Sequence, residues 1–282
     1  MTTDSASTPL LNLHQGRATI SLNRPAHHNR LHVQDLLVLQ QHFAALTADA
    51  TVKLLVLTGL GRSFCSGFHI GEFDAPASPN EVASRTFQAM PEKASAAAIQ
   101  ARASARPHLF EQTVDLLEAL PMPSICRLNG SVYGGATDLA LACDFRIGVA
   151  GMELRMPAAR LGLHYYPSGL QRYVTRLGLR HAKRLFLLAQ SVPDHELMAM
   201  GYLDHLAAAD QLDSAVQAMA DALAAGAPLA LRGMKTSLNE LARGDANLAE
   251  LRAREALCAQ SLDLREGKAA FAEKRMPRFI GR

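Results

Sequence analysis

One apolar run constrains the fold more than any other part of this sequence. It is VKLLVLTGLG (residues 52–61), in which nearly every residue before the glycines is hydrophobic. Strands that are buried on both faces have this composition, and they are typical of parallel sheets covered by helices. The glycines at its end indicate a tight turn. We therefore expect a central buried strand that enters a tight turn.

Neighbouring segments complete a strand–helix–strand pattern. RATISLNRP (residues 17–25) alternates apolar and polar residues and stops at a proline, which predicts a strand. Residues 33–49 place Leu36, Leu39 and Phe43 at helical spacing. The unit is repeated by SICRLNG (residues 124–130), a helix from about Gly135, and DFRIGVAG (residues 144–151). This order predicts an α/β fold with right-handed crossovers.

The other segments divide the chain further. Residues 71–108 are rich in Ala, Ser and Pro, so we expect an irregular segment of the kind that often acts as a lid, followed by a helix over residues 109–120. From residue 182 onward the sequence has a helical pattern. We therefore expect a core that carries the site over residues 1–205 and a helical part over residues 206–282.

Composition narrows the class of protein. The net charge is +3 and aromatic residues make up 5%, which argues against a nucleic-acid partner. The four cysteines lack metal-ligand spacing, so we expect buried free thiols, a reducing compartment and no metal site. There is no signal-peptide pattern, and no apolar run approaches about 18 residues. We expect a cytoplasmic protein with no membrane partner.

Two glycine-rich turns follow predicted strands. They are GRSFCSGFHI (residues 61–70) and NGSVYGGATD (residues 129–138), and neither has the spacing of a phosphate-binding loop. Two such turns can converge so that each offers one backbone N–H to a single oxygen, which makes an oxyanion hole. Asp138 follows the second turn, where it is either a proton-transfer group or an acid that favours the helix dipole.

The chain resembles the enoyl-CoA hydratase/isomerase (crotonase) superfamily over nearly its whole length. The segments that carry the resemblance are SLNRPAHHN, GLGRSFCSGFHI, PSICRLNGSVYGGATDLALACDFRIG, MPAARLGLHYYPSGLQRYVTRLG and REGKAAFAEKRMPRF, in the family's order. The resemblance implies a crotonase-like α/β spiral of ββα units with a helical C-terminal part, assembled as a homotrimer or a dimer of trimers. It implies an acyl-CoA thioester substrate, an enolate intermediate and no cofactor, because coenzyme A is part of the substrate.

The resemblance also implies roles for individual residues. The oxyanion hole is expected from the N–H groups of Phe68 and Gly135, and Asp138 is expected to transfer protons while Tyr166 and His69 assist it or shape the acyl pocket. The residues implied in CoA binding are Arg24, Ala26, His28, Ser66, Ile70, Phe271 and Lys274, the last two toward a neighbouring subunit. Other interpretations stay open: His69 as a packing residue, His28 as part of a polar turn, and Lys274 as part of a solvated helix face.

One departure from the family bears on the reaction. Hydratases of the family carry two glutamates, which match Asp138 and Ala158 here, so the second carboxylate is missing. Water addition needs one group to activate water and another to protonate the α-carbon, whereas double-bond isomerisation needs one base. We expect an enzyme of the hydratase/isomerase type. A CoA-thioester decarboxylase or C–C lyase of the same fold, and a non-catalytic acyl-CoA-binding protein, stay open as alternatives.

Overall fold

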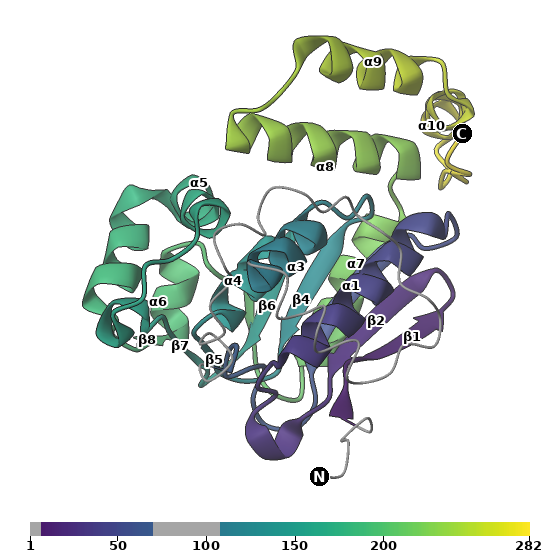
Figure 1. Cartoon of the computed structure of the whole chain (residues 1–282). Helices are drawn as coiled ribbons and strands as arrows, with labels where there is room; N and C mark the ends of the chain where they lie inside the picture. The colour runs from purple at the N-terminus through teal and green to yellow at the C-terminus, as the bar shows by residue number, and fades with distance from the viewer. Residues whose placement is uncertain (1–6, 70–107) are drawn as a thin grey trace.

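A six-stranded, mostly parallel sheet forms the centre of the molecule (Figure 1). The computed structural model describes residues 7–69 and 108–282. The strands, in spatial order, are β1 (Leu10–His14), β2 (Arg17–Leu22), β3 (Leu54–Gly59), β4 (Ser124–Leu128), β6 (Phe145–Val149) and β9 (His205–Ala207). β1 and β2 pair antiparallel, and the four pairs that follow are parallel.

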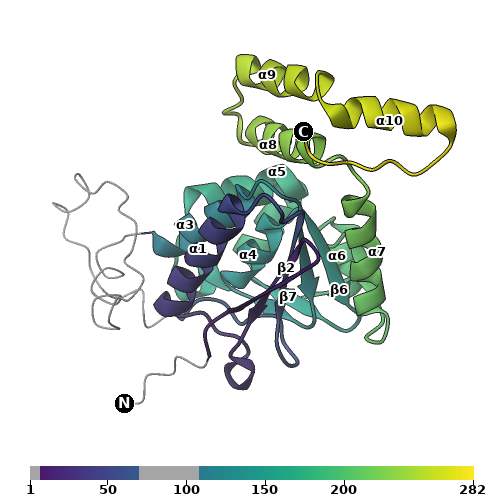
Figure 2. The same cartoon turned by 90° about the vertical axis from the view of Figure 1, so that its right-hand side faces the viewer.

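The third strand is buried on both faces, as its apolar run predicts. Leu55 and Leu57 of β3 belong to the main core cluster, together with α1 (Val33–Ala48). Leu54 and Val56 point the other way and pack with α7 (Leu212–Ala224). Figure 2 shows the sheet between these two helices. Removing this apolar surface from water stabilises the fold by roughly 25 cal/mol per Å².

Three helices and a small second sheet pack beside the main core cluster. The helices are α3 (Leu109–Glu118), α4 (Ala136–Ala142) and α5 (Pro167–Lys183). The second sheet has the order β5-β7-β8, from β5 (Val132–Tyr133), β7 (Glu153–Arg155) and β8 (Val192–Pro193), and α6 (Asp194–Ala199) follows it. Short turns complete the connections: 3₁₀ helices at Pro25–His27 and Ala158–Leu161, and a π-helical turn at Arg184–Leu188.

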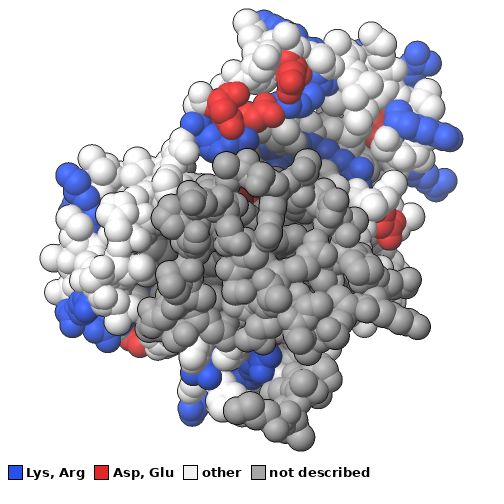
Figure 3. Space-filling model, viewed as in Figure 1, with Lys and Arg blue, Asp and Glu red and all other residues white. Residues whose placement is uncertain are grey.

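The last three helices form a separate layer on top of the core (Figures 1 and 2). They are α8 (Pro228–Arg243), α9 (Leu248–Ala259) and α10 (Leu262–Glu273). Lys235 anchors α8, because its buried Nζ lies 2.7 Å from Oδ2 of Asp144 and donates to the carbonyl of Met122. Figure 3 shows basic and acidic side chains interspersed on this layer, where Arg254 pairs with Glu240.

The structure confirms the predicted strand–helix–strand units and the helix that follows residue 108, but it corrects the C-terminal division. The predicted boundary between residues 205 and 206 falls inside β9, which pairs with β6 in the main sheet. The helical pattern from residue 182 also contains β8. These strands are two and three residues long, so they are too short to interrupt a helical pattern in the sequence. The separate helical layer begins at Pro228.

Two further features concern membranes and metals. Within residues 7–69 and 108–282, no single helix has the length and apolar composition to cross a membrane; α7 and α8, bent by 104°, meet that test only as a pair. Among the same residues there is no group of three or more His, Cys, Asp or Glu side chains arranged to hold a metal ion.

All four cysteines are free thiols, and three of them are buried.

Candidate active site

A cavity of about 470 Å³ opens where the two glycine-rich turns meet α3 and the start of α5. Its walls come from four parts of the chain that are far apart in sequence. The described lining residues are Ser66, Gly67, Phe68, His108, Phe110, Glu111, Tyr133, Gly134, Gly135, Met156, Pro157, Ala158, Leu161, Leu163, His164, Tyr165, Tyr166 and Pro167. Most of this surface is apolar, with a few polar groups, which is typical of a small-molecule site.

The two turns converge as the glycines predict. A β-carbon built on Gly67 would lie 2.8 Å from the carbonyl oxygen of Tyr133 and 3.3 Å from the backbone nitrogen of Gly135. Gly67 also has a φ of +96°, which other residues rarely adopt. A hydrogen bond from the N–H of Tyr133 to the carbonyl of Cys65 ties the turns together. Glycine therefore allows the two backbones to touch at the cavity wall.

Both predicted oxyanion-hole residues line this cavity. Phe68 follows Gly67, and its ring lies 5.8 Å from that of Phe110. Gly135 precedes α4, and in the part of the chain that the structure describes its N–H donates to no backbone acceptor. The ring of Phe110 also covers Gly135, since a β-carbon there would lie 2.7 Å from it.

Asp138 lies behind the cavity and does not form part of its wall. Its side chain on α4 is fully buried. Oδ2 accepts hydrogen bonds from the hydroxyl of Tyr166 at 2.5 Å and from Nη1 of Arg172 at 2.7 Å. Oδ1 has no hydrogen-bond partner among the described residues. Burial raises the pKa of Asp138, although Arg172 and Tyr166 oppose that shift.

A buried arginine holds three acidic side chains at this point. Arg172 on α5 contacts Asp138, Asp115 and Glu118 at distances of 2.7–3.0 Å, and its side chain is 2% exposed. Burial by itself would raise the pKa of Glu118, but the attraction to Arg172 and Arg176 is stronger, so this pKa lies below its ordinary value. Arg172 therefore offsets buried negative charge in this cluster, and Arg176 adds a second cation at 2.8 Å from Glu118.

Two stacked tyrosines separate this cluster from the cavity. The rings of Tyr165 and Tyr166 lie 4.3 Å apart, and both residues line the cavity. Burial, followed by the charge of Asp138, raises the pKa of both phenols well above 10, so both remain protonated near neutral pH. Gly169 makes this closeness possible, because a β-carbon there would lie 2.8 Å from Oδ2 of Asp138.

Other predicted site residues lie away from the cavity wall. The ring of His69 stacks on His32 at 5.0 Å, and His69 is absent from the described lining. Nε of Arg24 lies 3.1 Å from Oδ2 of Asp35, and Nδ1 of His28 lies 2.9 Å from Oγ of Ser63. Ala26 is exposed in the 3₁₀ turn.

The remaining predicted residues divide between the cavity, the C-terminal layer and the undescribed part of the chain. Ser66 lines the cavity, and so does Ala158, the position where the second acid is missing. Phe271 and Lys274 are exposed at the end of α10 and do not line it. Ile70 lies outside the described residues, as does most of the segment that we expected to act as a lid.

Sequence reasoning missed three residues at this site. Phe110 and Glu111 lie in the first turn of α3 and line the cavity, and Arg172 lies within the cluster behind it. A sequence signal existed for each. The helix was predicted from residue 109, and Arg172 belongs to the segment SGLQRYVTRLG that supported the family resemblance. Nothing in these patterns indicated which side of each helix faces the cavity.

Comparisons with known proteins point to one family. The sequence model of the enoyl-CoA hydratase/isomerase family matches residues 12–98 and 87–282. The chain is 29% identical to a crotonyl-CoA hydratase of Syntrophomonas wolfei, over 94% of this chain and 95% of that protein. It is 29% identical to the 2,3-dehydroadipyl-CoA hydratase of Escherichia coli, over 93% and 94%. A crystal structure of an enoyl-CoA hydratase from Bacillus anthracis covers 98% of this chain and 100% of its own, with 26% identity and a TM-score of 0.79.

The chain belongs to the enoyl-CoA hydratase/isomerase family. It is an enzyme of this family, of the type that acts on acyl-CoA thioesters. The predictions of the superfamily and of the crotonase-like fold are thereby confirmed.

Proposed function

We propose that this enzyme binds the thioester carbonyl oxygen of an acyl-CoA between the N–H groups of Phe68 and Gly135. Proton loss from the α-carbon would then produce an enolate whose negative oxygen those two donors stabilise. The approach of the two glycine turns at the cavity wall carries the proposal, because a β-carbon built on Gly67 would lie only 3.3 Å from the Gly135 nitrogen. A single oxyanion-hole donor contributes roughly 2.7–4 kcal/mol in other enzymes.

Among the reactions that pass through such an enolate, the cavity best supports a shift of a carbon–carbon double bond between the 3- and 2-positions. This reaction needs one group that removes and returns a proton, whereas water addition uses two. Ala158 lines the cavity where family hydratases carry their second carboxylate. Tyr166 lines it too and accompanies Asp138, which we propose to hold this phenol in place. No cofactor is required.

Hydration is the second candidate, and one observation favours it. The relatives from Syntrophomonas wolfei and Escherichia coli are both named as hydratases of 2-enoyl-type CoA thioesters, and they match almost the whole chain. Hydration would need a water-activating group in the cavity that compensates for the alanine at position 158. The two candidates therefore differ in the product that they form from the same thioester class.

The proposal can be tested with a panel of CoA thioesters followed by NMR or mass spectrometry. We expect a 3-enoyl-CoA to become the 2-enoyl isomer, and the α-protons of a saturated acyl-CoA to exchange with deuterated water. Conversion of crotonyl-CoA to the 3-hydroxy product at a higher rate would favour hydration. Release of carbon dioxide from malonyl-CoA without either reaction would overturn both candidates, and the absence of both isomerisation and α-proton exchange would overturn the double-bond shift.

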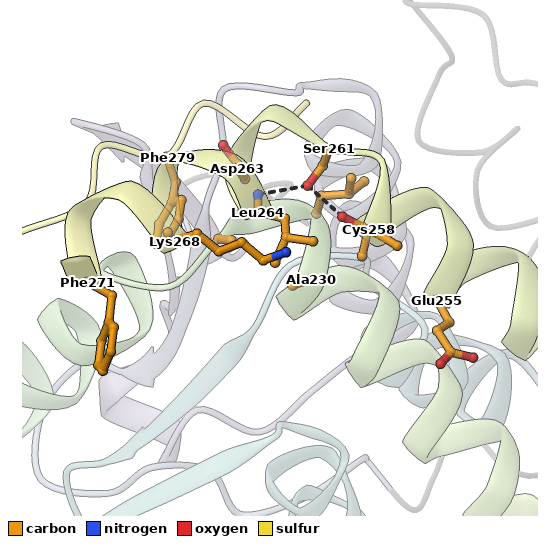
Figure 4. Close-up of a pocket in the computed structure, with 13 residues that line it drawn as sticks. Ala230, Glu255, Cys258, Ser261, Asp263, Leu264, Lys268, Phe271 and Phe279 are labelled. Carbon is orange, nitrogen blue, oxygen red and sulfur yellow. Dashed lines mark hydrogen bonds between the residues drawn. The ribbon is translucent and has the colours of Figure 1, made fainter.

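We also propose that the C-terminal layer joins copies of this chain into a trimer or a dimer of trimers. Large apolar side chains are exposed on it, including Leu238 at 65% and Phe271 at 87%. Exposed apolar patches of this kind mark association surfaces. A groove of about 540 Å³ lies among these helices, and Figure 4 shows Phe271 of α10 at one end and Glu255 of α9 at the other. Phe271 and Lys274 would then reach the CoA of a neighbouring copy.

Light scattering during gel filtration tests the assembly. We expect a mass three or six times that of one chain, and we expect Phe271→Asp to lower either this mass or the affinity for CoA thioesters. A stable monomer with full activity would contradict the proposal. If Phe271→Asp changes neither the mass of the assembly nor the affinity for CoA thioesters, Phe271 has neither of the roles that we propose for it.

A further inference from the structure

One carboxylate faces the cavity, and it is not the one that the sequence predicts. Of the described residues that line the cavity, Glu111 is the sole Asp or Glu. It lies in the first turn of α3, and its side chain is 20% exposed. Asp138, in contrast, is fully buried, with Tyr166 and Arg172 both bonded to one oxygen. A proton-transfer group must reach the reacting carbon, which favours Glu111.

Both oxygens of Glu111 are held by neighbouring side chains. The hydroxyl of Ser168, on α5, donates to Oε1 at 3.1 Å. Nδ1 of His108 lies 3.4 Å from Oε2. These contacts come from two parts of the chain, one from α5 and one from the residue that precedes α3. The side chain is therefore oriented in advance, as a catalytic acid or base needs to be.

Glu111 also lies where an acid stabilises a helix. An acid in the first turn of a helix stabilises it through the helix dipole by about 0.3–1 kcal/mol. In this chain, however, α3 has no side-chain cap hydrogen bond at its N-terminus. The carboxylate turns instead toward Ser168 on another helix, beside the cavity. The dipole accounts for an acid at this position but not for its contact with α5.

We propose that Glu111 is the proton-transfer residue of the double-bond shift, positioned by Ser168 and His108. This inference rests on the proposed function. The Glu111 carboxylate takes a proton from C2 of a bound 3-enoyl thioester, and the electron pair of that C–H bond moves into the carbonyl to form the dienolate. The resulting carboxylic acid then donates the same proton to C4, and the electrons return to make the C2–C3 double bond. One C–H bond breaks and one forms, so no other reactant is needed.

The test compares three variants in the full-length enzyme with a 3-enoyl-CoA substrate. We expect Glu111→Gln to lower kcat by about 10²- to 10⁴-fold, the usual contribution of a general acid–base group. Glutamine preserves the shape, the helix position and an acceptor for Ser168, so the melting temperature and the Kd for a saturated acyl-CoA should change little. Glu111→Asp, which keeps a carboxylate, should retain more activity than Glu111→Gln. Asp213→Asn, an exposed carboxylate change on α7, should have no effect.

Ser168→Ala tests the positioning step. It should lower kcat by less than Glu111→Gln does and leave the Kd for the saturated acyl-CoA unchanged, whereas a purely structural role would alter the melting temperature without this kcat effect. A wild-type enzyme that isomerises the substrate, together with a Glu111→Gln enzyme of equal kcat, would overturn the role of Glu111 alone. A wild-type enzyme that neither isomerises a 3-enoyl-CoA nor exchanges α-protons would overturn the proposed function and this inference with it.

Discussion

The hydroxyl oxygen of Tyr166 lies 2.5 Å from Oδ2 of Asp138, with the phenol at the cavity wall and the carboxylate behind it. Asp138, to which the family resemblance assigns proton transfer, is therefore separated from the cavity by the side chain of Tyr166. Asp138 contacts Tyr166 and Arg172 directly, and Glu111 meets the cavity from another helix. In the mechanism that we propose, Asp138 holds the cavity wall in place and Glu111 moves the proton.

This separation predicts different outcomes for substitutions at Asp138 and Tyr166. Asp138→Asn breaks one buried ion pair of Arg172, which keeps Asp115 and Glu118 as partners, so we expect the free energy of unfolding to fall by about 2–4 kcal/mol. Tyr166→Phe removes a neutral donor, and we expect a smaller loss of about 1–2 kcal/mol. Urea unfolding measures both. Any Asp138→Asn enzyme that folds should keep more kcat than Glu111→Gln; unchanged stability with a larger loss of kcat would make Asp138 the direct proton carrier.

The acidic cluster around Arg172 should make the free energy of unfolding depend on pH in the acidic range. The pKa of Glu118 is lowered in the folded state, so Glu118 binds fewer protons there than in the unfolded chain. Its stabilising contribution is present above its ordinary pKa of 4.5 and is lost as the pH falls through the folded value. We expect Glu118→Gln to be less stable at pH 7 and to lose less stability than wild type on acidification below pH 4.5. Parallel pH profiles would contradict this.

Replacement of a glycine by alanine should destabilise the protein at Gly169 in α5 but not at Gly233 in α8. A β-carbon at Gly169 would lie 2.5 Å from the Tyr165 ring and 2.7 Å from the Tyr166 ring. We expect Gly169→Ala to destabilise the protein by about 1–3 kcal/mol and to lower activity, because the stacked tyrosines must move. Gly233→Ala is the matched control: its nearest atom would be 3.8 Å away, so it should raise stability by about 0.4–1 kcal/mol. Equal melting temperatures for the two variants would refute the tight packing at Gly169.

The cysteines should differ in reactivity although all four are free. Burial raises the pKa of Cys65 to about 12, so almost no thiolate forms at pH 8. We expect an alkylating reagent to modify Cys258, the partly exposed thiol, first under native conditions, and Cys65 after denaturation. Mass spectrometry of peptides identifies the modified residue. Because the unfolded chain releases the Cys65 proton near pH 9 and the folded chain near 12, stability should also decline as the pH rises above 9. Rapid native modification of Cys65 would contradict its burial.

Local patterns predicted the elements of the fold better than their assembly. The run at residues 52–61 contains the buried strand β3, because a strand covered on both faces must be apolar throughout. The paired glycines likewise indicated a close backbone approach, which Gly67 shows. β8 and β9 were not predicted, because two or three residues are too few to show an alternating apolar pattern. Both strands form by pairing with strands that are distant in sequence.

The candidate site was harder to predict for a related reason. Gly135 and Phe68 belong to contiguous motifs, and both line the cavity. The orientation of Asp138, in contrast, depends on Arg172, which lies 34 residues later and enters the same cluster from another helix. Glu111 follows a long segment without a clear pattern, so its place opposite Ser168 is visible only in three dimensions. Tertiary contacts decide which acid lines the cavity.

The most direct test of the whole account is the vibrational frequency of a bound thioester carbonyl. An acyl-CoA with a ¹³C-labelled carbonyl, measured by difference infrared spectroscopy at saturating enzyme, reports the hydrogen bonds to its oxygen. If the N–H groups of Phe68 and Gly135 hold that oxygen, the stretch should move to lower frequency than in water, since two aligned donors polarise the bond. An unchanged frequency in a complex shown by separate binding measurements to be saturated would contradict the account.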